Sequence, residues 1–326
     1  MKTPQRPIGT GFDEKSTAKD VIAGIDMEGK RIVVTGGHSG IGLEATRVLS
    51  EAGASLVVGA RNVSEAKKAL AGVENVEVSE LDLSEPSSVD GFAENFRKAY
   101  GSLDVLINNA GIMATPFLRN SQGNEMQFAT NHLGHFRLTG GLWDVIRNAK
   151  GRVITLSSSG HQFSGVDFDD PNFQSRPYDK WVAYGQSKTA CSLLAVHLDE
   201  IGKESGVRAF AVHPGWIAST NLGRFMTDQD RAAFASPAPG AAKFAASIIK
   251  SGPQGAATTV WAATSPQLEG MGGVYCADCD IAPLIADEVS QQNGVRRWAV
   301  DPGIAERLWE LGGRLSGFRW PVEILA

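Results

Sequence analysis

Cysteine is scarce in this 326-residue sequence, which contains three: Cys191, Cys276 and Cys279. Three cysteines cannot build a disulfide framework. Basic residues are not in excess either, because 31 Lys and Arg face 36 Asp and Glu, which argues against a nucleic-acid-binding surface. No apolar run approaches the ~18 residues of a membrane span, and the N-terminus lacks the apolar core of a secretory signal. We therefore expect a globular cytoplasmic protein that binds neither nucleic acid nor membrane.

What the sequence does contain is a regular alternation of short apolar runs and longer helical segments. Segments with helical periodicity, such as 41–53 and 87–101, separate the runs. The runs have the continuous Val, Ile and Leu character of strands that are covered on both faces. They comprise residues 31–37, 55–61, 76–83, 103–111, 152–158, 207–215 and 272–278. We predict the α/β class: a single Rossmann-type, doubly wound domain with a seven-stranded parallel sheet and helices on both faces.

Three segments fall outside this alternation, and no linker or internal repeat divides the chain. Residues 1–28 are predicted to form an N-terminal extension with one short helix, and residues 29–326 the Rossmann domain. Residues 160–181 and 219–238 are predicted to be substrate loops, because such sheets bind ligands at the carboxyl ends of their strands. A C-terminal tail from residue 281 ends in a predicted helix.

A glycine-rich turn, TGGHSGIG at residues 35–42, joins the first predicted strand to a helix. Glycines permit a tight turn and let the backbone approach a phosphate closely. The helix that follows offers free N–H groups and the positive end of its dipole. An ordinary turn also uses glycine, but the position between a buried strand and a helix favours dinucleotide binding.

The end of the second predicted strand bears on which dinucleotide binds. Sites that prefer NAD carry Asp or Glu there, which accepts a hydrogen bond from the ribose 2′-hydroxyl. The sequence instead reads Gly59-Ala60-Arg61-Asn62, and an arginine can pair with a 2′-phosphate. We therefore predict NADP(H) in preference to NAD(H); the alternative is that Arg61 is a solvated turn residue.

Four motifs, in this order, resemble the short-chain dehydrogenase/reductase family: TGGHSGIG, NNAG at 108–111, YGQSK at 184–188 and Pro214-Gly215. The resemblance covers residues 29–280. It is strongest to the retinol-dehydrogenase-like and WW-domain-oxidoreductase-like group, on the strings GARN, TNHLGHF, SSSGH and YGQSK. It implies hydride transfer between a nicotinamide cofactor and a small-molecule carbonyl or alcohol substrate.

Tyr184 and Lys188 are the central pair that the resemblance implies. Among four tyrosines, Tyr184 is the one with a lysine four residues later, and positions i and i+4 share a face of a helix. A phenol is a weak acid–base catalyst near neutrality, and nearby positive charge favours its anion. Tyr184 is expected to be the general acid in reduction; the alternative is a packed tyrosine beside a solvated lysine.

The resemblance adds Ser158 and Asn131 to the predicted catalytic set. Ser158 is expected to hold the substrate carbonyl oxygen, and strand alternation separates it from Ser157 and Ser159. The three serines could instead only satisfy backbone groups at the end of the strand. Asn131 is expected to hold a water that links Lys188 to solvent; a buried asparagine bonded only to the helix backbone is the alternative.

Further positions carry over to the cofactor by motif. Arg61 is assigned to the 2′-phosphate, and Ser219 in preference to Thr220 to the carboxamide, although the family usually has threonine at the first of these places. The other predicted cofactor contacts, from the pyrophosphate through the adenine and ribose to the nicotinamide, are Gly36, His38, Ser39, Gly40, Ile41, Gly42, Asn62, Asp82, Leu83, Asn109, Ala110, Gly111, Tyr184, Lys188, Pro214, Gly215 and Ile217.

No metal site is predicted. His132 and His135 have no third ligand at a recognisable spacing, and the pair Cys276 and Cys279 has no partner pair. Six aromatic residues near the predicted loops either form an apolar wall for the substrate or pack the loops onto the sheet. They are Phe163, Phe168, Phe173, Trp181, Trp216 and Phe225.

The sequence thus predicts an NADP(H)-dependent carbonyl reductase or alcohol dehydrogenase. The resemblance also implies a homodimer or homotetramer, paired through the helices that flank the fifth strand. Two alternatives stay open: a binding protein that senses NADP(H) without turnover, and a reductase of C=C or C=N bonds on the same scaffold. The fold by itself does not decide the substrate.

Overall fold

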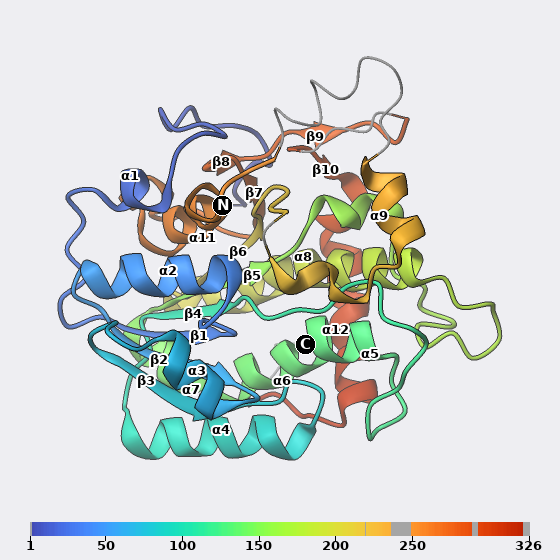
Figure 1. Ribbon diagram of the computed structural model, residues 1–326, viewed down its shortest axis with the longest axis horizontal. Helices are drawn as coiled ribbons and strands as arrows, with labels where there is room; N and C mark the ends of the chain where they lie inside the picture. The colour runs from blue at the N-terminus through green and yellow to red at the C-terminus, as the bar shows by residue number, and fades with distance from the viewer. Residues whose placement is uncertain (1, 219, 236–248, 289–292, 322–326) are drawn as a thin grey trace.

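The central sheet has eight strands in the order β3-β2-β1-β4-β5-β6-β7-β8 (Figure 1). The computed structural model describes residues 2–218, 220–235, 249–288 and 293–321. The first seven strands pair in parallel and coincide with the seven predicted runs. They are β1 (Arg31–Thr35), β2 (Ser55–Ala60), β3 (Val76–Glu80), β4 (Val105–Asn108), β5 (Arg152–Leu156), β6 (Arg208–His213) and β7 (Val274–Ala277). The predicted doubly wound α/β fold is confirmed.

The predicted number of strands is wrong by one. After β7 the chain turns back through Asp278 and Cys279, whose φ angles are +51° and +60°. Two consecutive residues with positive φ make the tight turn of a hairpin. The short strand β8 (Asp280–Ile281) then pairs antiparallel with β7. Two residues are too few to show an apolar pattern. A separate parallel pair comprises β9 (Leu284–Ile285) and β10 (Val295–Arg296).

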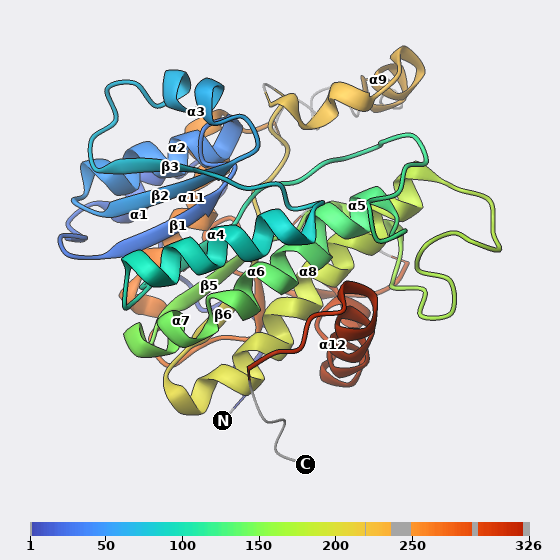
Figure 2. The same ribbon diagram turned by 90° about the horizontal axis from the view of Figure 1, so that it is seen from below.

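Helices cover both faces of the sheet, each over its own apolar core (Figure 2). One face carries α1 (Ala18–Ile22), α2 (Gly40–Glu51) and α11 (Gly252–Thr264). The other carries α4 (Pro86–Ala99), α6 (Gly134–Gly141), α7 (Trp143–Ala149) and α8 (Lys180–Gly202). The remaining helices are α3 (Val63–Ala69), α5 (Met126–Phe128), η1 (Ala129–Leu133), η2 (Ser159–Phe163), η3 (Lys203–Ser205), η4 (Asn221–Phe225), α9 (Asp228–Ala235), η5 (Pro266–Leu268), η6 (Arg297–Ala299) and α12 (Pro302–Ser316). No helix in the described ranges has the length and apolar character to cross a membrane.

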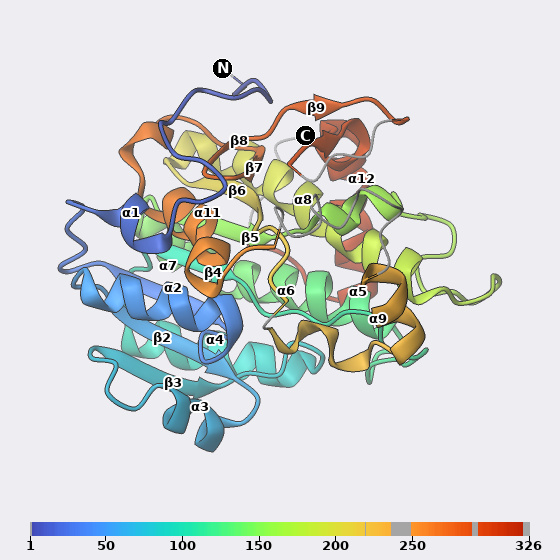
Figure 3. The ribbon, with the colours of Figure 1, turned by 45° about the horizontal axis from the view of Figure 1, so that its top comes forward.

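The N-terminal segment is bound to the edge of the sheet that the C-terminal half forms. The Gln5 side chain donates to the carbonyls of Tyr275 at 2.8 Å and Ala282 at 2.7 Å, and it accepts from the Tyr275 N–H at 2.9 Å. Further along, α1 buries Val21 and Ile22 in the same core as α2 and α11, and it lies beside α11 in Figure 3. These contacts connect the two ends of the fold across more than 200 residues of sequence.

The C-terminal helix α12 covers the outer side of α6 and α8 (Figure 2). Its Leu308 and Leu311 share an apolar cluster with side chains of α8. The Trp309 ring lies 5.0 Å from Phe136 on α6, and Trp320 lies 5.4 Å from Trp143 on α7. An aromatic tail of the same chain therefore covers the helices that flank β5.

Candidate functional site

The glycine turn between β1 and α2 is packed too tightly for side chains. A methyl group at Gly42 would lie 2.5 Å from Asn109 Nδ2 and 2.7 Å from the Gly36 carbonyl oxygen. Gly36 and Gly40 have φ angles of +66° and +54°, which side chains disfavour. Ser39 precedes α2 without a side-chain capping bond, so N–H groups of the first turn stay available to an anion. This cradle fits the pyrophosphate of a dinucleotide.

Thr35 at the end of β1 joins this turn to the segment after β4. Its hydroxyl oxygen accepts hydrogen bonds from the N–H groups of Asn109 and Ala110, both at 2.9 Å. The Asn109 side chain donates to the Thr35 carbonyl at 2.8 Å. The same hydroxyl lies 2.9 Å from His135 Nε2, to which it donates its proton. Asn109 and Ala110, which the family resemblance assigns to the ribose, therefore lie at the edge of the glycine turn.

Gly111 lies where two of the predicted catalytic residues meet. A methyl group at this position would be 3.2 Å from Asn131 Oδ1 and 3.5 Å from Lys188 Nζ. Lys188 is buried, and its ammonium group donates to the Leu156 carbonyl at 2.9 Å. The same nitrogen lies 5.8 Å from the centre of the Tyr184 ring. Tyr184, Lys188 and Asn131 are thus brought together from α8 and from the helix before β5.

Asn131 lies in a five-residue π-helix, Ala129–Leu133, between α5 and α6. Its Oδ1 accepts from the Ile112 N–H at 2.8 Å, and its Nδ2 donates to the Ile112 carbonyl and the Ser187 hydroxyl, both at 2.9 Å. Its own carbonyl accepts from His135 Nδ1 at 2.9 Å. The side chain therefore bonds to other segments and not to its own helix. π-Helices are rare and are found frequently at functional sites.

Two of the three serines after β5 face different neighbours. The Ser157 hydroxyl donates to the Lys188 carbonyl at 2.8 Å, so it serves the backbone of α8. Ser158 Oγ accepts from the Gly160 N–H at 3.0 Å, which leaves its own proton available to a ligand. A methyl group at Gly160 would lie 2.6 Å from the Tyr184 ring and 3.4 Å from Ser158 Oγ. Ser158 and the Tyr184 ring therefore border the same small space.

Of the residues predicted to contact the adenine end of the cofactor, one is exposed to solvent and others form hydrogen bonds with their sequence neighbours. Arg61 is exposed directly after β2. Asn62 caps α3, because its Oδ1 accepts from the Glu65 N–H at 3.2 Å. Asp82 Oδ1 accepts from the Ser84 N–H at 2.9 Å and the Ser84 hydroxyl at 2.6 Å. Asn62 and Asp82 thus have structural bonds of their own, whereas the Arg61 guanidinium is open to solvent.

His38 and Leu83 complete this side. Burial lowers the pKa of His38; the positive charge of Arg61 also lowers it, and the negative charge of Glu65 opposes them. Leu83 packs against Gly134, where a methyl group would lie 2.8 Å from the Leu83 Cβ. The structure therefore places His38 close to the charges of α3, and Leu83 against the helix that follows Asn131.

The segment after β6 carries the predicted nicotinamide contacts. Gly215 has a φ of +89°, and a methyl group there would lie 2.6 Å from the buried Lys250 side chain. Ile217 is nearly buried, and its carbonyl accepts from the Thr220 hydroxyl at 3.3 Å. Ser219 lies outside the described residues. The tight passage at Gly215 explains why glycine follows Pro214.

Two residues that the sequence analysis did not single out hold Ser158 in place. Gly160 leaves room for the Tyr184 ring, as described above. Burial lowers the pKa of His161 to about 4, so the ring is neutral near pH 7. Its Nδ1–H donates to the Ser158 carbonyl at 2.7 Å, and its Nε2 accepts from the Arg296 N–H at 3.1 Å. Both residues belong to the SSSGH string, which was the signal for them.

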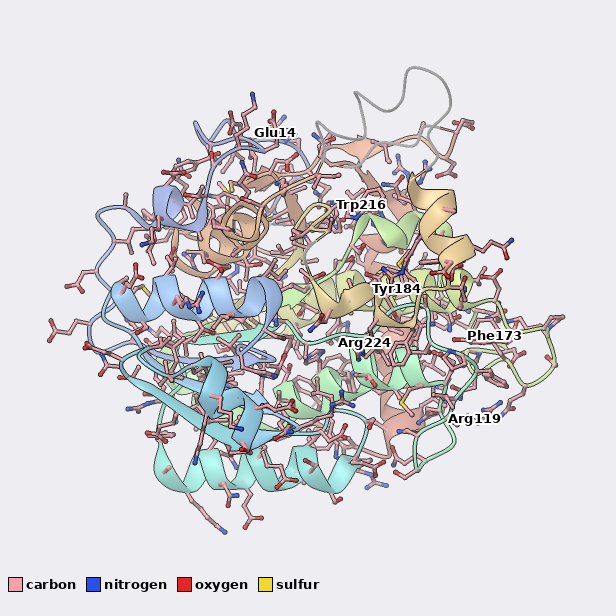
Figure 4. The ribbon with its side chains drawn as sticks, viewed as in Figure 1. Glu14, Arg119, Phe173, Tyr184, Trp216 and Arg224 are labelled. Carbon is pink, nitrogen blue, oxygen red and sulfur yellow. The ribbon has the colours of Figure 1, made fainter. Side chains whose placement is uncertain are left out.

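The aromatic residues near the predicted loops do not act as one wall. Phe173 is buried, and its ring lies 5.1 Å from Tyr178. Phe163 and Phe225 are 52% and 39% exposed. Figure 4 labels Phe173 on the loop before α8, and Tyr184 on α8 itself. Phe173 therefore packs its loop in place, whereas Phe163 and Phe225 are open to a ligand.

The histidine pair and the cysteine pair singled out from the sequence are buried. Within the described ranges no group of three or more His, Cys, Asp or Glu could hold a metal ion. Burial lowers the pKa of His132 to about 3 and that of His135 to about 4. Burial also raises the pKa of the Cys276 thiol, and that of Cys279 to about 11, which disfavours the reactive thiolate.

Comparison with known proteins identifies the family. The short chain dehydrogenase family matches residues 30–231 of the chain. A protein named "Probable oxidoreductase" from Streptomyces lividans is 42% identical over 303 residues, which cover 88% of this chain and 98% of that protein. A WW domain-containing oxidoreductase from Pongo abelii is 34% identical over 317 residues, covering 93% of this chain and 74% of that protein.

A solved structure agrees. The crystal structure of an uncharacterized protein from Mycobacterium paratuberculosis has a TM-score of 0.72 and 32% identity to this chain, and the match covers 94% of this chain and 100% of that one. A sheet of this order, a glycine cradle for a dinucleotide and a tyrosine–lysine pair on one helix are all present. The chain belongs to the short-chain dehydrogenase/reductase family, and so is an oxidoreductase that uses a nicotinamide cofactor.

Proposed function

We propose that the protein is an NADP(H)-dependent oxidoreductase that interconverts a carbonyl and an alcohol, with Tyr184 as the acid–base residue. The proposal rests on one observation: the predicted catalytic residues, which come from different segments, meet at two glycines. Ser158 and the Tyr184 ring both border Gly160, and Lys188 and Asn131 both border Gly111. When bound, a nicotinamide cofactor supplies or accepts the hydride.

Tyr184 gives its phenolic proton to the carbonyl oxygen in reduction, and takes it back in oxidation. The Lys188 ammonium lies 5.8 Å from the centre of the ring, so a positive charge stands beside the group that transfers the proton. Lys188 uses one of its three protons on the Leu156 carbonyl at 2.9 Å, so two remain for other partners. Its position is therefore fixed while its charge stays available.

Ser158 orients the carbonyl oxygen beside Tyr184. Its Oγ accepts from the Gly160 N–H, so its hydroxyl proton points to a different acceptor, which we assign to the substrate oxygen. Two donors on one oxygen polarise the carbonyl and align it. Asn131 is proposed to link Lys188 to solvent through a water, because its Oδ1 and Lys188 Nζ border the same glycine.

Arg61 supports the preference for NADP(H). No acidic residue stands at the end of β2, where Ala60 is followed by Arg61 and Asn62. The Asn62 side chain is used to cap α3, so the exposed guanidinium of Arg61 is the group that can meet a phosphate.

We propose that a homodimer or homotetramer of this protein would pair through a different face from the one that the family resemblance implies. The family resemblance implies pairing through the helices that flank β5. Here α12 and Trp320 cover α6 and α8. We therefore propose that any oligomer of this protein pairs through another surface.

The test is oxidation of NADPH and NADH with a broad panel of aldehydes and ketones, comparing the parent protein with Tyr184→Phe. Turnover with NADPH should fall by about 100-fold or more in the variant, because removing a positioned general acid costs ~10²–10⁴ in rate. NADPH binding, measured by fluorescence, should change less than about twofold. Tyr100→Phe is the matched control, because the Tyr100 hydroxyl bonds Glu77 at 2.8 Å, far from Lys188.

Each result bears on a different part of the proposal. NADPH that binds without turnover on the whole panel would favour a sensor of the cofactor. Turnover of conjugated C=C or C=N substrates alone would favour the other reductase chemistry. Better turnover with NADH would show that Arg61 does not select the cofactor.

A further inference from the structure

Two arginines from distant parts of the sequence lie near the glycine turn. Arg61 follows β2, and Arg224 belongs to η4, the short helix after β6. A methyl group at Gly40 would lie 3.4 Å from Thr220 Cγ2, so the chain that enters η4 lies against the first residue of α2. Figures 1 and 2 both show this segment beside α2, and Figure 4 labels Arg224 there.

The two arginines are close enough for the charge of Arg61 to act on Arg224. Neighbouring atoms that displace water lower the pKa of Arg224, and the positive charge of Arg61 lowers it further. The charge of Arg61 also lowers the pKa of His38. Like charges held together raise the free energy of the protein unless an anion lies between them.

Among the residues that the structure describes, no acidic side chain forms an ion pair with either arginine. The arginines that form ion pairs within the described ranges are Arg47, Arg137, Arg176 and Arg208. Glu65 is close enough to raise the pKa of His38, but it makes no ion pair with Arg61 or Arg224 among the described residues. The positive charge at this place is therefore available to a ligand.

Arg224 is also held in a defined position. Its Nη1 donates to the Asn221 carbonyl at 3.2 Å, and its guanidinium lies over the Phe225 ring at 4.7 Å from the ring centre. Arg231 on α9 donates to the Gly223 carbonyl at 2.9 Å and so steadies η4. A guanidinium has five N–H donors, and Arg224 uses one of them on Asn221.

We propose that Arg224 is a second residue that binds the 2′-phosphate of NADP(H), opposite Arg61. The inference rests on the NADP(H) preference proposed above. A phosphate monoester carries up to two negative charges and accepts bidentate bonds from arginine, so it satisfies both guanidinium groups at once. NAD(H) has no such group and leaves the two positive charges unopposed. Binding of NADP(H) also ties the segment after β6 to the cofactor.

The test is equilibrium binding by the parent protein and Arg224→Ala, with four probes: NADPH, NADH, 2′,5′-ADP and 5′-AMP. Loss of one charge-assisted contact at an exposed site should weaken the binding of NADPH and of 2′,5′-ADP by about tenfold. NADH and 5′-AMP should change less than about twofold. Lys67→Ala is the matched control, because it removes one exposed positive charge from the adjacent helix α3, and it should leave all four probes within about twofold.

A double variant sharpens the test. If both arginines contact one phosphate, the losses in NADPH affinity from Arg61→Ala and Arg224→Ala should not add in the double variant. If Arg224→Ala weakens the binding of NADPH and NADH equally, Arg224 contacts a group that both cofactors share, and the inference is overturned. No weakening would overturn it as well. A parent protein that does not bind NADPH would instead remove the proposed function, on which the inference rests.

Discussion

The two regions on either side of Tyr184 hold their polar groups in opposite ways. Toward α8 and the π-helix, Lys188 and Asn131 are buried, and their side chains bond to backbone groups within 3 Å. Toward the segment after β6, Arg224 is exposed and lies near another positive charge. The Lys188 and Asn131 side chains are held in place by backbone groups of the protein, whereas the second region has charge that a ligand would satisfy.

This difference separates the two requirements of the proposed reaction. Proton and hydride transfer need reacting groups held within a fraction of an ångström, which dense packing and hydrogen bonds to the backbone provide. Recognition of a charged cofactor needs groups that are not already paired, because an internal ion pair would compete with the ligand. The region around α8 therefore suits the proposed positioning of reacting groups, and the exposed charge near η4 suits the proposed contact with the cofactor.

Acid should disrupt the first region, and this is the largest effect we expect. Burial lowers the pKa of His132 and His213 to about 3, and of His135, His161 and His197 to about 4. In the unfolded chain these histidines bind a proton near pH 6.5, whereas in the folded protein they do so only near pH 3 to 4. Their neutral forms therefore favour the folded state fully above pH 6.5, and this contribution to the free energy of unfolding is lost as the pH falls toward 4. Each group can contribute up to about 1.4 kcal/mol per pH unit. Denaturant unfolding at pH 7, 6 and 5 should show a steep fall in the free energy of unfolding.

A single substitution checks that histidines cause this fall. Both ring nitrogens of His132 are buried without a hydrogen-bond partner among the described residues. His132→Leu should therefore raise the free energy of unfolding at pH 7 by about 1 kcal/mol. It should also make the free energy of unfolding less dependent on pH, because one of the buried histidines has been removed. Glu125 acts in the opposite direction, because burial raises its pKa. An unchanged slope in His132→Leu would contradict the assignment.

The next effect tests how closely Tyr184 is positioned. Gly160→Ala would put a methyl group 2.6 Å from the Tyr184 ring, so the ring must move from Ser158. We expect kcat to fall by about 100-fold, since small displacements of reacting groups cost rates of that order. NADPH affinity should change less than about twofold. Gly165→Ala is the control, because the nearest atom would be 3.9 Å away, on Trp298. A fully active Gly160→Ala would show that the ring tolerates displacement.

The sequence predicted the parts of this site that depend on local pattern. Seven apolar runs gave the parallel strands, and the spacing of Tyr184 and Lys188 gave their shared helix face. Contacts between distant segments could not be predicted from the sequence. The π-helix at Asn131 depends on bonds to Ile112 and Ser187, and the proximity of Arg224 to Arg61 depends on how η4 crosses the glycine turn. No periodicity within one segment records such contacts.

The smallest effect concerns the ion pair that joins the two regions. Lys180, at the start of α8, pairs with Asp230 on α9. A positive charge at a helix N-terminus is unfavourable, so Asp230 offsets a cost within α8. The N–H and hydroxyl of Thr227 donate to the same carboxylate at 2.7 and 2.8 Å, and these bonds stay in place without Lys180. The pair therefore adjusts the position of α9 and is not needed to form it.

Lys180→Met should therefore raise the KM for the carbonyl substrate by about threefold, because a partly exposed ion pair contributes up to about 1 kcal/mol. The kcat value and the affinity for NADPH should stay within about twofold, since Tyr184 and Lys188 lie deeper in α8. The matched control is Lys203→Met, which removes the bond to Glu200 at the opposite end of the helix and should change neither constant. A fall in kcat without a rise in KM would show that the ion pair supports the buried region around Lys188 and not the exposed region around η4. The distinction between a region that positions reacting groups and a region that binds the ligand would then not hold for Lys180.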